Sequence, residues 1–219
     1  MTYALGIETS GKSCSVGLFQ KGKCLHLKES PREQSHAELL AIITKDILAV
    51  EEITPSQLNY IALSHGPGSY SGLRIGASFA KGLSYALEIP LISIDTTYCI
   101  ALALQEKQIC DYYVAMIDAR RNEVYTQIFD KQLYAIEPIK SMILEPNAYA
   151  KYKGGILFGG DACTKWKEQC ADKKDKTFIE EDLRSAKYLS VASYEKYQKG
   201  LVENTAYYEP NYLKQFTGR

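Results

Sequence analysis

The chain has 219 residues, a length that fits one large domain or two small ones. Hydrophobic residues make up 46% of it and charged residues 24%, which is typical of folded globular proteins and excludes disordered, collagen-like and low-complexity chains. The 26 basic and 26 acidic residues cancel, so the chain as a whole carries no positive charge with which to bind nucleic acid. The first residues lack a leader pattern and no segment approaches the ~18 apolar residues of a membrane span, so we expect a cytoplasmic protein that does not enter a membrane.

The residue types that usually carry catalysis show no informative spacing. Six cysteines and three histidines are scattered without a pattern of metal ligands, so we predict no metal site. Three separate histidines do not allow a catalytic triad to be assigned. Some carboxylates stand at the ends of predicted strands, where catalytic acids occur but where turns and helix caps also place them, and we favour the structural interpretation. These carboxylates are Glu8, Asp95, Asp118 and Glu123.

The first half of the sequence predicts a sheet with two covering helices. Ser35 and Glu38 form a capping box before apolar residues that recur at helical spacing up to Val50. A second long helix follows the turn-rich segment 65–72 and must end before Pro90. Short apolar runs predict strands at 3–9, 13–20, 23–29, 60–63 and 91–94, followed by a helix over 96–107.

The second long helix carries a small residue at every fourth position: Gly72, Gly76, Ala80 and Ser84. Glycine inside a helix costs ~1 kcal/mol relative to alanine, so close packing along this face is expected to offset the loss. The pattern alone leaves two packing partners open, the protein's own sheet and a helix of another chain.

The second half repeats this order of elements. The predicted strands are 112–118, 123–130, 133–137, 156–158 and 178–180, and the predicted helices are 145–152, 161–170 and 185–199. Because three strands, a helix, a strand and a helix occur twice, we predict a duplicated topology with an N-terminal domain at 1–105 and a C-terminal domain at 106–219.

Glycine-containing turns occur at ETSG (8–11), GPGS (66–69) and the glycine pairs 154–155 and 159–160. None matches a nucleotide-binding fingerprint by itself. Their order, together with IDARR (117–121) and GGDA (159–162), resembles the two phosphate loops and the adenosine loop of the actin-like ATPase (ASKHA) fold. This resemblance implies an α/β protein built from two RNase H-like domains.

Longer segments carry a more specific resemblance: IETSGKSCSVGL, QSHAELL, HGPGSYSGLRIGASFAKGLSYAL, IDARRNEVY and EPNYLKQF. They are similar to the TsaB-like branch of the glycoprotease-like family over most of residues 3–130. The resemblance implies a non-catalytic subunit for threonylcarbamoyladenosine modification of adenosine 37 in tRNA, which binds and organises the catalytic subunit TsaD. It also implies the ATPase TsaE as a second partner, contact with tRNA only through the complex, and pairing of the isolated protein with itself.

The resemblance also selects candidate site residues. It places the partner interface on the two long helices of the first half, at His36, Leu39, Leu40, Ile43, Gly72, Ile75, Gly76, Phe79 and Ala80. Residues near a nucleotide would be Thr9, Ser10, Gly11 and Asp118, with ATP or ADP at the partner junction and no cofactor bound tightly. Catalytic relatives carry a His-x-x-x-His motif where this chain has Thr96 and Ile100, and these side chains cannot replace imidazole ligands. We therefore predict no catalytic residue and no enzyme activity for this chain alone.

Two other functions stay open at this point. A glycoprotease-like metallopeptidase requires metal ligands, and stoichiometric zinc or iron in the purified protein would support it. A kinase of the actin-like fold would turn over ATP, and loss of that turnover on changing Thr9 or Asp118 would support this alternative.

Overall fold

The structure is a computed structural model that describes residues 1–30 and 36–214, and it consists of two compact units. The first unit contains Met1–Thr96 and Ser185–Asn211, and the second contains Thr97–Arg184 and the residues from Tyr212 onward. The predicted domain boundary at residue 105 is therefore displaced, and the predicted C-terminal domain is interrupted. The physical reason is that the segment after Arg184 packs on the first sheet, where the amide of Ala186 donates a hydrogen bond to the Ser15 hydroxyl (3.0 Å).

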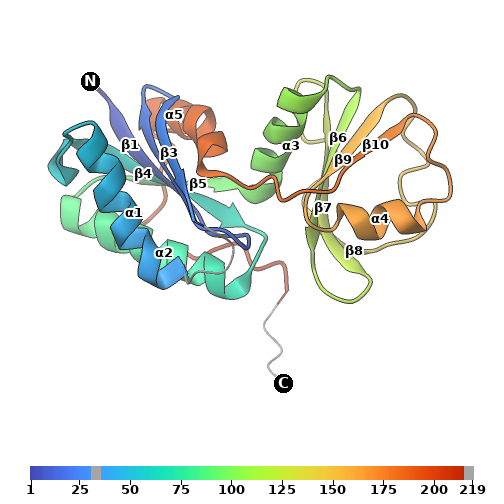
Figure 1. Cartoon of the computed structure of the whole chain (residues 1–219), viewed down its shortest axis with the longest axis horizontal. Helices are drawn as coiled ribbons and strands as arrows, with labels where there is room; N and C mark the ends of the chain where they lie inside the picture. The colour runs from blue at the N-terminus through green and yellow to red at the C-terminus, as the bar shows by residue number, and fades with distance from the viewer. Residues whose placement is uncertain (31–35, 215–219) are drawn as a thin grey trace. The chain divides into compact units, whose positions relative to one another are not determined.

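The first unit is built on a five-stranded sheet (Figure 1), and its strand order is β3-β2-β1-β4-β5. The central strand β1 pairs antiparallel with β2 and parallel with β4, and β4 pairs parallel with β5. The strands are β1 (Tyr3–Glu8), β2 (Ser15–Gln20), β3 (Lys23–Glu29), β4 (Leu58–Gly66) and β5 (Leu91–Asp95). The helices are α1 (His36–Val50), α2 (Tyr70–Leu87), α5 (Ser190–Gln198) and the short 3-10 helices η1 (Pro55–Gln57) and η2 (Ala186–Leu189).

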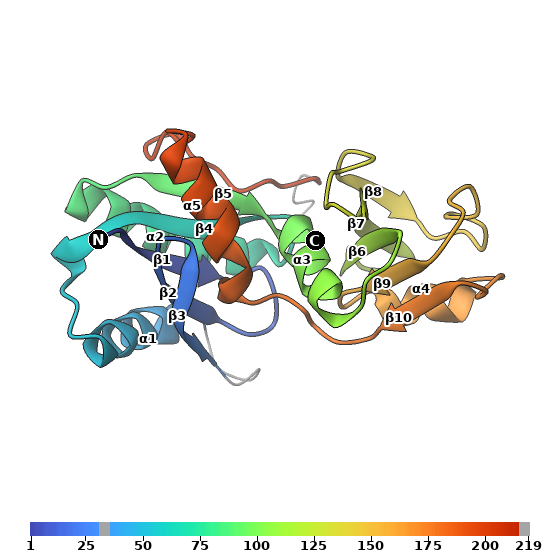
Figure 2. The same ribbon diagram turned by 90° about the horizontal axis from the view of Figure 1, so that it is seen from above.

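The helices α1 and α2 cover one face of this sheet and α5 covers the other (Figure 2). Alternation along β4 explains the division, since successive side chains of a strand point to opposite faces. Ile61 and Leu63 belong to the apolar cluster under α1 and α2, whereas Tyr60 stacks on Tyr197 of α5 with ring centroids 4.7 Å apart. The predicted capping residue Ser35 and the end of the EPNYLKQF segment, Gln215 and Phe216, lie outside the described residues.

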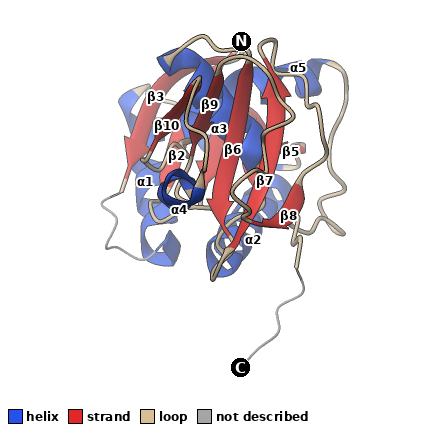
Figure 3. Cartoon of the chain, turned by 90° about the vertical axis from the view of Figure 1, so that its right-hand side faces the viewer, coloured by secondary structure: helices blue, strands red, loops and turns tan. Residues whose placement is uncertain are grey.

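The second unit has the strand order β10-β9-β6-β7-β8 (Figure 3). β6 pairs antiparallel with β7 and parallel with β9, so its sheet repeats the first one strand for strand. This confirms the predicted duplication and the α/β fold of two RNase H-like domains. The elements are α3 (Thr96–Lys107, which begins at the last residue of the first unit), β6 (Tyr112–Asp118), β7 (Glu123–Asp130), β8 (Lys140–Ile143), β9 (Ile156–Gly159), α4 (Cys163–Gln169) and β10 (Lys176–Ile179). None of the described helices combines the length and the apolar character needed to cross a bilayer.

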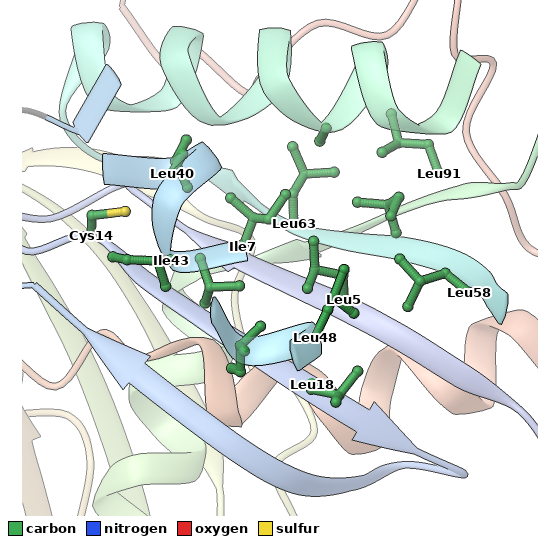
Figure 4. Packing of buried hydrophobic residues seen from close by; sticks show 14 of the residues in the cluster. Leu5, Ile7, Cys14, Leu18, Leu40, Ile43, Leu48, Leu58, Leu63 and Leu91 are labelled. Atoms are coloured by element: carbon green, nitrogen blue, oxygen red, sulfur yellow. The ribbon is translucent and has the colours of Figure 1, made fainter. Parts of the chain in front are cut away.

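The apolar interior of the first unit lies between its sheet and α1 and α2 (Figure 4). Leu40, Ile43 and Leu48 point from α1 toward the strand residues Leu5 and Ile7. These strand side chains have no exposed surface, and burial of each such leucine or isoleucine contributes roughly 1.5–3 kcal/mol relative to an exposed position. One stripe of α1 is therefore committed to the core.

The predicted strand at 133–137 is wrong. Leu133 has a positive φ of 65°, and the Asp130 carboxylate accepts hydrogen bonds from the amides of Gln132 and Tyr134, both at 2.9 Å. These bonds close a turn directly after β7, since an aspartate that bonds the following amides stabilises a turn instead of a strand. The third strand of the second sheet is β8, which begins later at Lys140.

The predicted helix at 145–152 is also wrong, because this segment forms successive turns. The amides of Ala148 and Ala150 each donate to the carbonyl three residues earlier. Two side chains hold these turns in place: the Tyr149 hydroxyl bonds Thr126 of β7 (2.8 Å), and the Tyr152 hydroxyl donates to Glu137 in the loop between β7 and β8 (2.5 Å). Tertiary contacts of the two tyrosines thus replace the helical pattern that the sequence suggests.

Glu137 is a hub of charge-assisted hydrogen bonds, and we predict that it makes the second unit sensitive to acid. Lys140, Lys151 and Tyr152 all donate to its carboxylate and hold its pKa at about 2. A carboxyl group whose pKa is lower in the folded than in the unfolded state stabilises the fold at pH values above the unfolded pKa of ~4.3. This stabilisation is lost as the pH falls from there toward the folded pKa. Glu137→Gln should lower the free energy of unfolding at neutral pH by about 1 kcal/mol.

Urea unfolding between pH 7 and pH 2.5 checks this prediction. The variant should lose less stability than the wild type across the acid range, because the titrating group is gone. Glu145→Gln is a matched control, since this carboxylate lies exposed nearby in the sequence. Identical acid profiles for wild type and Glu137→Gln would contradict the assignment.

Candidate functional site

An open groove runs between α1 and α2 on the outer side of the first unit. It has a volume of about 380 Å³ and is lined by Ala37, Leu40, Arg74, Ile75, Ser78 and Phe79. Apart from Arg74 and Ser78 its lining is apolar. The Arg74 guanidinium lies over the ring of Tyr70, 4.2 Å from the ring centroid, and is the charged group of the groove. Apolar surface beside a single cation is typical of a site where a partner molecule docks.

The predicted interface residues of α1 divide between core and surface. Leu40 and Ile43 are buried in the apolar cluster of the first unit, so Ile43 is not available to a partner and Leu40 contributes only to the floor of the groove. Leu39 is half-buried against the same cluster. His36 is half-buried as well, and its Nε2 lies 3.2 Å from the carbonyl oxygen of Gly11.

The predicted glycine row of α2 faces the protein's own chain. A Cβ at Gly72 would stand 2.1 Å from the carbonyl oxygen of Thr9, and a Cβ at Gly76 would stand 2.2 Å from the Thr9 hydroxyl. Ala80 has no exposed surface. These three residues therefore lie on the inner face of α2, so they are beneath a partner interface on this helix and do not contact a partner themselves; close packing on the first unit explains why they are small.

The residues that point outward from α2 form a second row, which the sequence reasoning missed. Ser78, Gly82 and Ala86 are exposed, and a Cβ at Gly82 would meet no atom within 4 Å. Residues two positions apart in a helix are separated by about 200° around its axis. A row shifted by two residues from the glycine row therefore lies on the opposite face. The spacing of Gly82 relative to Gly76 was the available signal. Ile75 and Phe79, which were predicted, are half-buried and line the groove beside this row.

The predicted phosphate loop at the end of β1 is closed by the protein itself. Thr9, Ser10 and Gly11 are all buried, and exposure begins only at Lys12. The Ser10 amide donates to the Glu8 carboxylate (2.6 Å), and the Ser10 carbonyl accepts from the Ser69 amide (2.8 Å). The backbone amide that a phosphate would need is thus engaged by a carboxylate of the same chain.

Asp118 belongs to the second unit, whereas Thr9, Ser10 and Gly11 belong to the first. The Asp118 carboxylate accepts hydrogen bonds from Lys165 Nζ and from the Arg120 amide, both at 2.6 Å. Its own amide donates to Asp161 of the GGDA turn (2.8 Å). The other glycine pair is engaged in the same way, since the Gly155 amide donates to Asp111 (2.8 Å).

Thr96 and Ile100, which occupy the positions of the expected metal ligands, are both fully buried at the start of α3. Within residues 1–30 and 36–214, no three His, Cys, Asp or Glu side chains come together in a way that could hold a metal ion. His65 and Asp95 lie at the ends of the neighbouring strands β4 and β5. Burial lowers the pKa of His65 and raises the pKa of Asp95. His65 Nδ1 also lies 3.0 Å from the Tyr208 hydroxyl, so the hydrogen bond between His65 and Tyr208 joins β4 to the segment after α5.

We predict that a glycine-to-alanine substitution changes the free energy of unfolding in opposite directions in the two rows of α2. Gly76→Ala forces a Cβ against Thr9 and should lower the free energy of unfolding by about 1–3 kcal/mol. Gly82→Ala adds a Cβ in open space and should raise it by roughly 0.5–1 kcal/mol, because alanine favours the helix. Urea denaturation followed by circular dichroism measures both, and a shift of the two variants in the same direction would contradict the assigned faces.

The matches to known proteins agree with this fold. The family model described as "TsaD: tRNA N6-adenosine threonylcarbamoyltransferase" matches residues 30–156. The tRNA threonylcarbamoyladenosine biosynthesis protein TsaB of Haemophilus influenzae is 36% identical over 121 residues, which cover 55% of this chain and 51% of that protein. TsaB of Escherichia coli is 35% identical over 122 residues, covering 55% of this chain and 52% of that protein.

The chain thus spans about half the length of the curated relatives that it matches. Among solved structures, YeaZ from Pseudomonas aeruginosa superposes with a TM-score of 0.84 and 23% identity, covering 97% of this chain and 100% of that chain, which shows a common fold. The family model matches more than half of the sequence, so this chain belongs to the TsaD family, and within that family its sequence matches the TsaB proteins.

Proposed function

We propose that this chain is a non-catalytic subunit in threonylcarbamoyladenosine modification of adenosine 37 in tRNA, and that it docks the TsaD-type catalytic subunit on α1 and α2. The observation that carries the proposal is the outward face of this helix pair. On this face an apolar groove lies beside the exposed row of small residues Ser78, Gly82 and Ala86. A Cβ at Gly82 would meet no atom of the described chain within 4 Å, so packing within this chain does not require a glycine there. The names of the matched relatives, which refer to threonylcarbamoyladenosine biosynthesis, supply the pathway.

The physical chemistry of the face fits another pair of helices as its occupant. Small residues at four-residue spacing allow a second helix to approach closely, and ridges of its side chains then enter the groove. Ile75 and Phe79 supply half-buried apolar contact at the centre of such an interface. Arg74 beside them would select a partner with a carboxylate at the matching position.

Two features support a role without chemistry of its own. Thr96 and Ile100 stand where catalytic relatives are expected to hold a metal, and neither side chain is a usual metal ligand. The amides of Ser10 and Gly155 are bonded to Glu8 and Asp111, so these turns are filled by carboxylates. In this proposal ATP or ADP, the ATPase TsaE and tRNA engage the chain only through the complex. The same helix face serves self-pairing when the catalytic subunit is missing.

The test mixes the purified chain with the TsaD-type subunit from the same source and measures binding by calorimetry and complex mass by light scattering. Ser78→Trp places a large ring in the outward row and should weaken binding by about tenfold to 100-fold, which corresponds to 1–3 kcal/mol of overpacking. Gly82→Ala should stabilise the isolated chain and yet weaken the complex, since its methyl group keeps the partner helix at a distance. Opposite signs from one substitution distinguish an interface from a merely structural site.

Val191→Trp is the matched control, because Val191 is 57% exposed on α5, on the other face of the same sheet. It should bind as wild type does. Equal affinity of wild type and Ser78→Trp would place the interface elsewhere. If the wild-type chain forms no complex at all, the subunit proposal fails, and metal content and ATP turnover of the isolated chain then test the metallopeptidase and kinase alternatives.

A further inference from the structure

The segment 203–211, which follows α5, lies along the edge of the first sheet and along the flank of α2; we call it the strap. At its start the Glu203 amide donates to the Leu91 carbonyl of the edge strand β5 (2.8 Å), and the Glu203 carboxylate accepts a hydrogen bond from Ser93. Further along, the Thr205 hydroxyl lies 3.1 Å from the Ser84 hydroxyl of α2. The strap therefore joins β5 to α2.

Lys81 is the charged connection between α2 and the strap. Its Nζ donates to two backbone carbonyls of the strap, those of Ala206 and Tyr208, both at 3.1 Å. Hydrogen bonds from an ammonium group are stronger than neutral ones, and the two carbonyls lie two residues apart in a segment that forms neither helix nor strand. One side chain of α2 thus fixes the path of the strap.

Tyr208 anchors the far end of the strap beneath α2. Its ring is 6% exposed and belongs to the apolar cluster of the first unit, and its hydroxyl lies 3.0 Å from His65 Nδ1 at the end of β4. The amide of Asn211 then donates to the His65 carbonyl (2.8 Å). Both ends of the strap are consequently fastened to the sheet, while its middle holds α2.

The inner face of α2 explains why such a fastening matters. At Gly72 and Gly76 the helix presents bare backbone to Thr9, so these positions offer no ridge of side chains to interlock with the sheet. Contacts on the flank of the helix then set its rotation and its lateral position. The outward residues Ser78 and Gly82 lie on the same two turns of α2 as Lys81, which bonds the strap.

We propose that Lys81 and Tyr208 are positioning residues: by fastening the strap to α2 they hold its outward row where a partner helix can pack. This inference rests on the proposed function. It predicts that loosening the strap weakens partner binding without any change in the residues that touch the partner.

The experiment compares Lys81→Met, Tyr208→Phe and the double variant with wild type, using hydrogen exchange and calorimetric titration with the TsaD-type subunit. In the double variant the amides of the strap and of the last two turns of α2 should exchange at least about tenfold faster. Partner affinity should fall by about tenfold, and Lys81→Arg, which keeps the charge, should retain most of it. Lys45→Met, an exposed substitution on α1, is the control and should exchange as wild type does.

A disulfide provides a rescue that a loss of general stability would not show. The Ser84 and Thr205 hydroxyls lie 3.1 Å apart, so Ser84→Cys with Thr205→Cys can form a bond that locks the strap to α2. In the Lys81→Met and Tyr208→Phe background, partner affinity should return when this bond is oxidised and fall again when it is reduced.

Each outcome bears on one idea. If strap amides stay protected in the double variant, Lys81 and Tyr208 do not fasten the strap and the inference is wrong. If the strap is released and affinity is unchanged, or if oxidation restores nothing, the strap does not position α2 for the partner. If wild type itself binds no partner, the proposed function fails, and exchange still reports whether these two residues hold the strap.

Discussion

The backbone of α2 rests directly on Thr9, the residue that follows the central strand of the first sheet, with room for no side-chain atom at Gly72 or Gly76. This close approach buries Thr9 and Ser10 and covers the turn that resembles a phosphate loop. Because the glycine face of α2 lies against Thr9, the opposite row, with Ser78 and Gly82, faces outward. The closed loop and the exposed docking face are two consequences of one contact.

The turns that resemble nucleotide loops are held together by carboxylates of the same chain. Glu8 accepts from the Ser10 amide in the first unit, and Asp111 accepts from the Gly155 amide in the second. Asp161 of the GGDA turn bonds the Asp118 amide and also the guanidinium of Arg184, the last residue before the chain returns to the first unit. Backbone amides that suit a phosphate are equally suited to a carboxylate, and here the carboxylate makes the turn part of the scaffold.

The two units share one strand order, but among the residues that the structure describes only the first unit pairs two long helices on a sheet face. In the second unit the segment 145–152, which corresponds to α1 in the sequence of elements, forms turns instead; Tyr149 bonds them to β7 and Tyr152 bonds them to Glu137 in the loop after β7. The match to the TsaD family model ends at residue 156, so it includes both helices of the docking face but not the strap at 203–211. The helix face and the segment that holds α2 therefore belong to different stretches of sequence.

Periodicity in the sequence determined most of the fold. Alternating and continuous apolar runs identified nine of the strands, and helical spacing identified α1, α2, α3, α4 and α5, because these patterns follow from local backbone geometry. They also gave the duplicated topology and the helices of the candidate site. The strand at 133–137 and the helix at 145–152 failed where turn bonds of Asp130 and tertiary bonds of two tyrosines outweigh local preference.

Only the tertiary structure decided how the site faces the solvent. Rows of small residues through Gly76 and through Gly82 have the same spacing in the sequence, and contact with Thr9 selects the first for the interior. The sequence equally does not indicate that the segment after Arg184 returns to the first sheet, or that Lys81 meets the carbonyl of a residue more than a hundred positions later. Such contacts join residues far apart in the chain, and no local pattern records them.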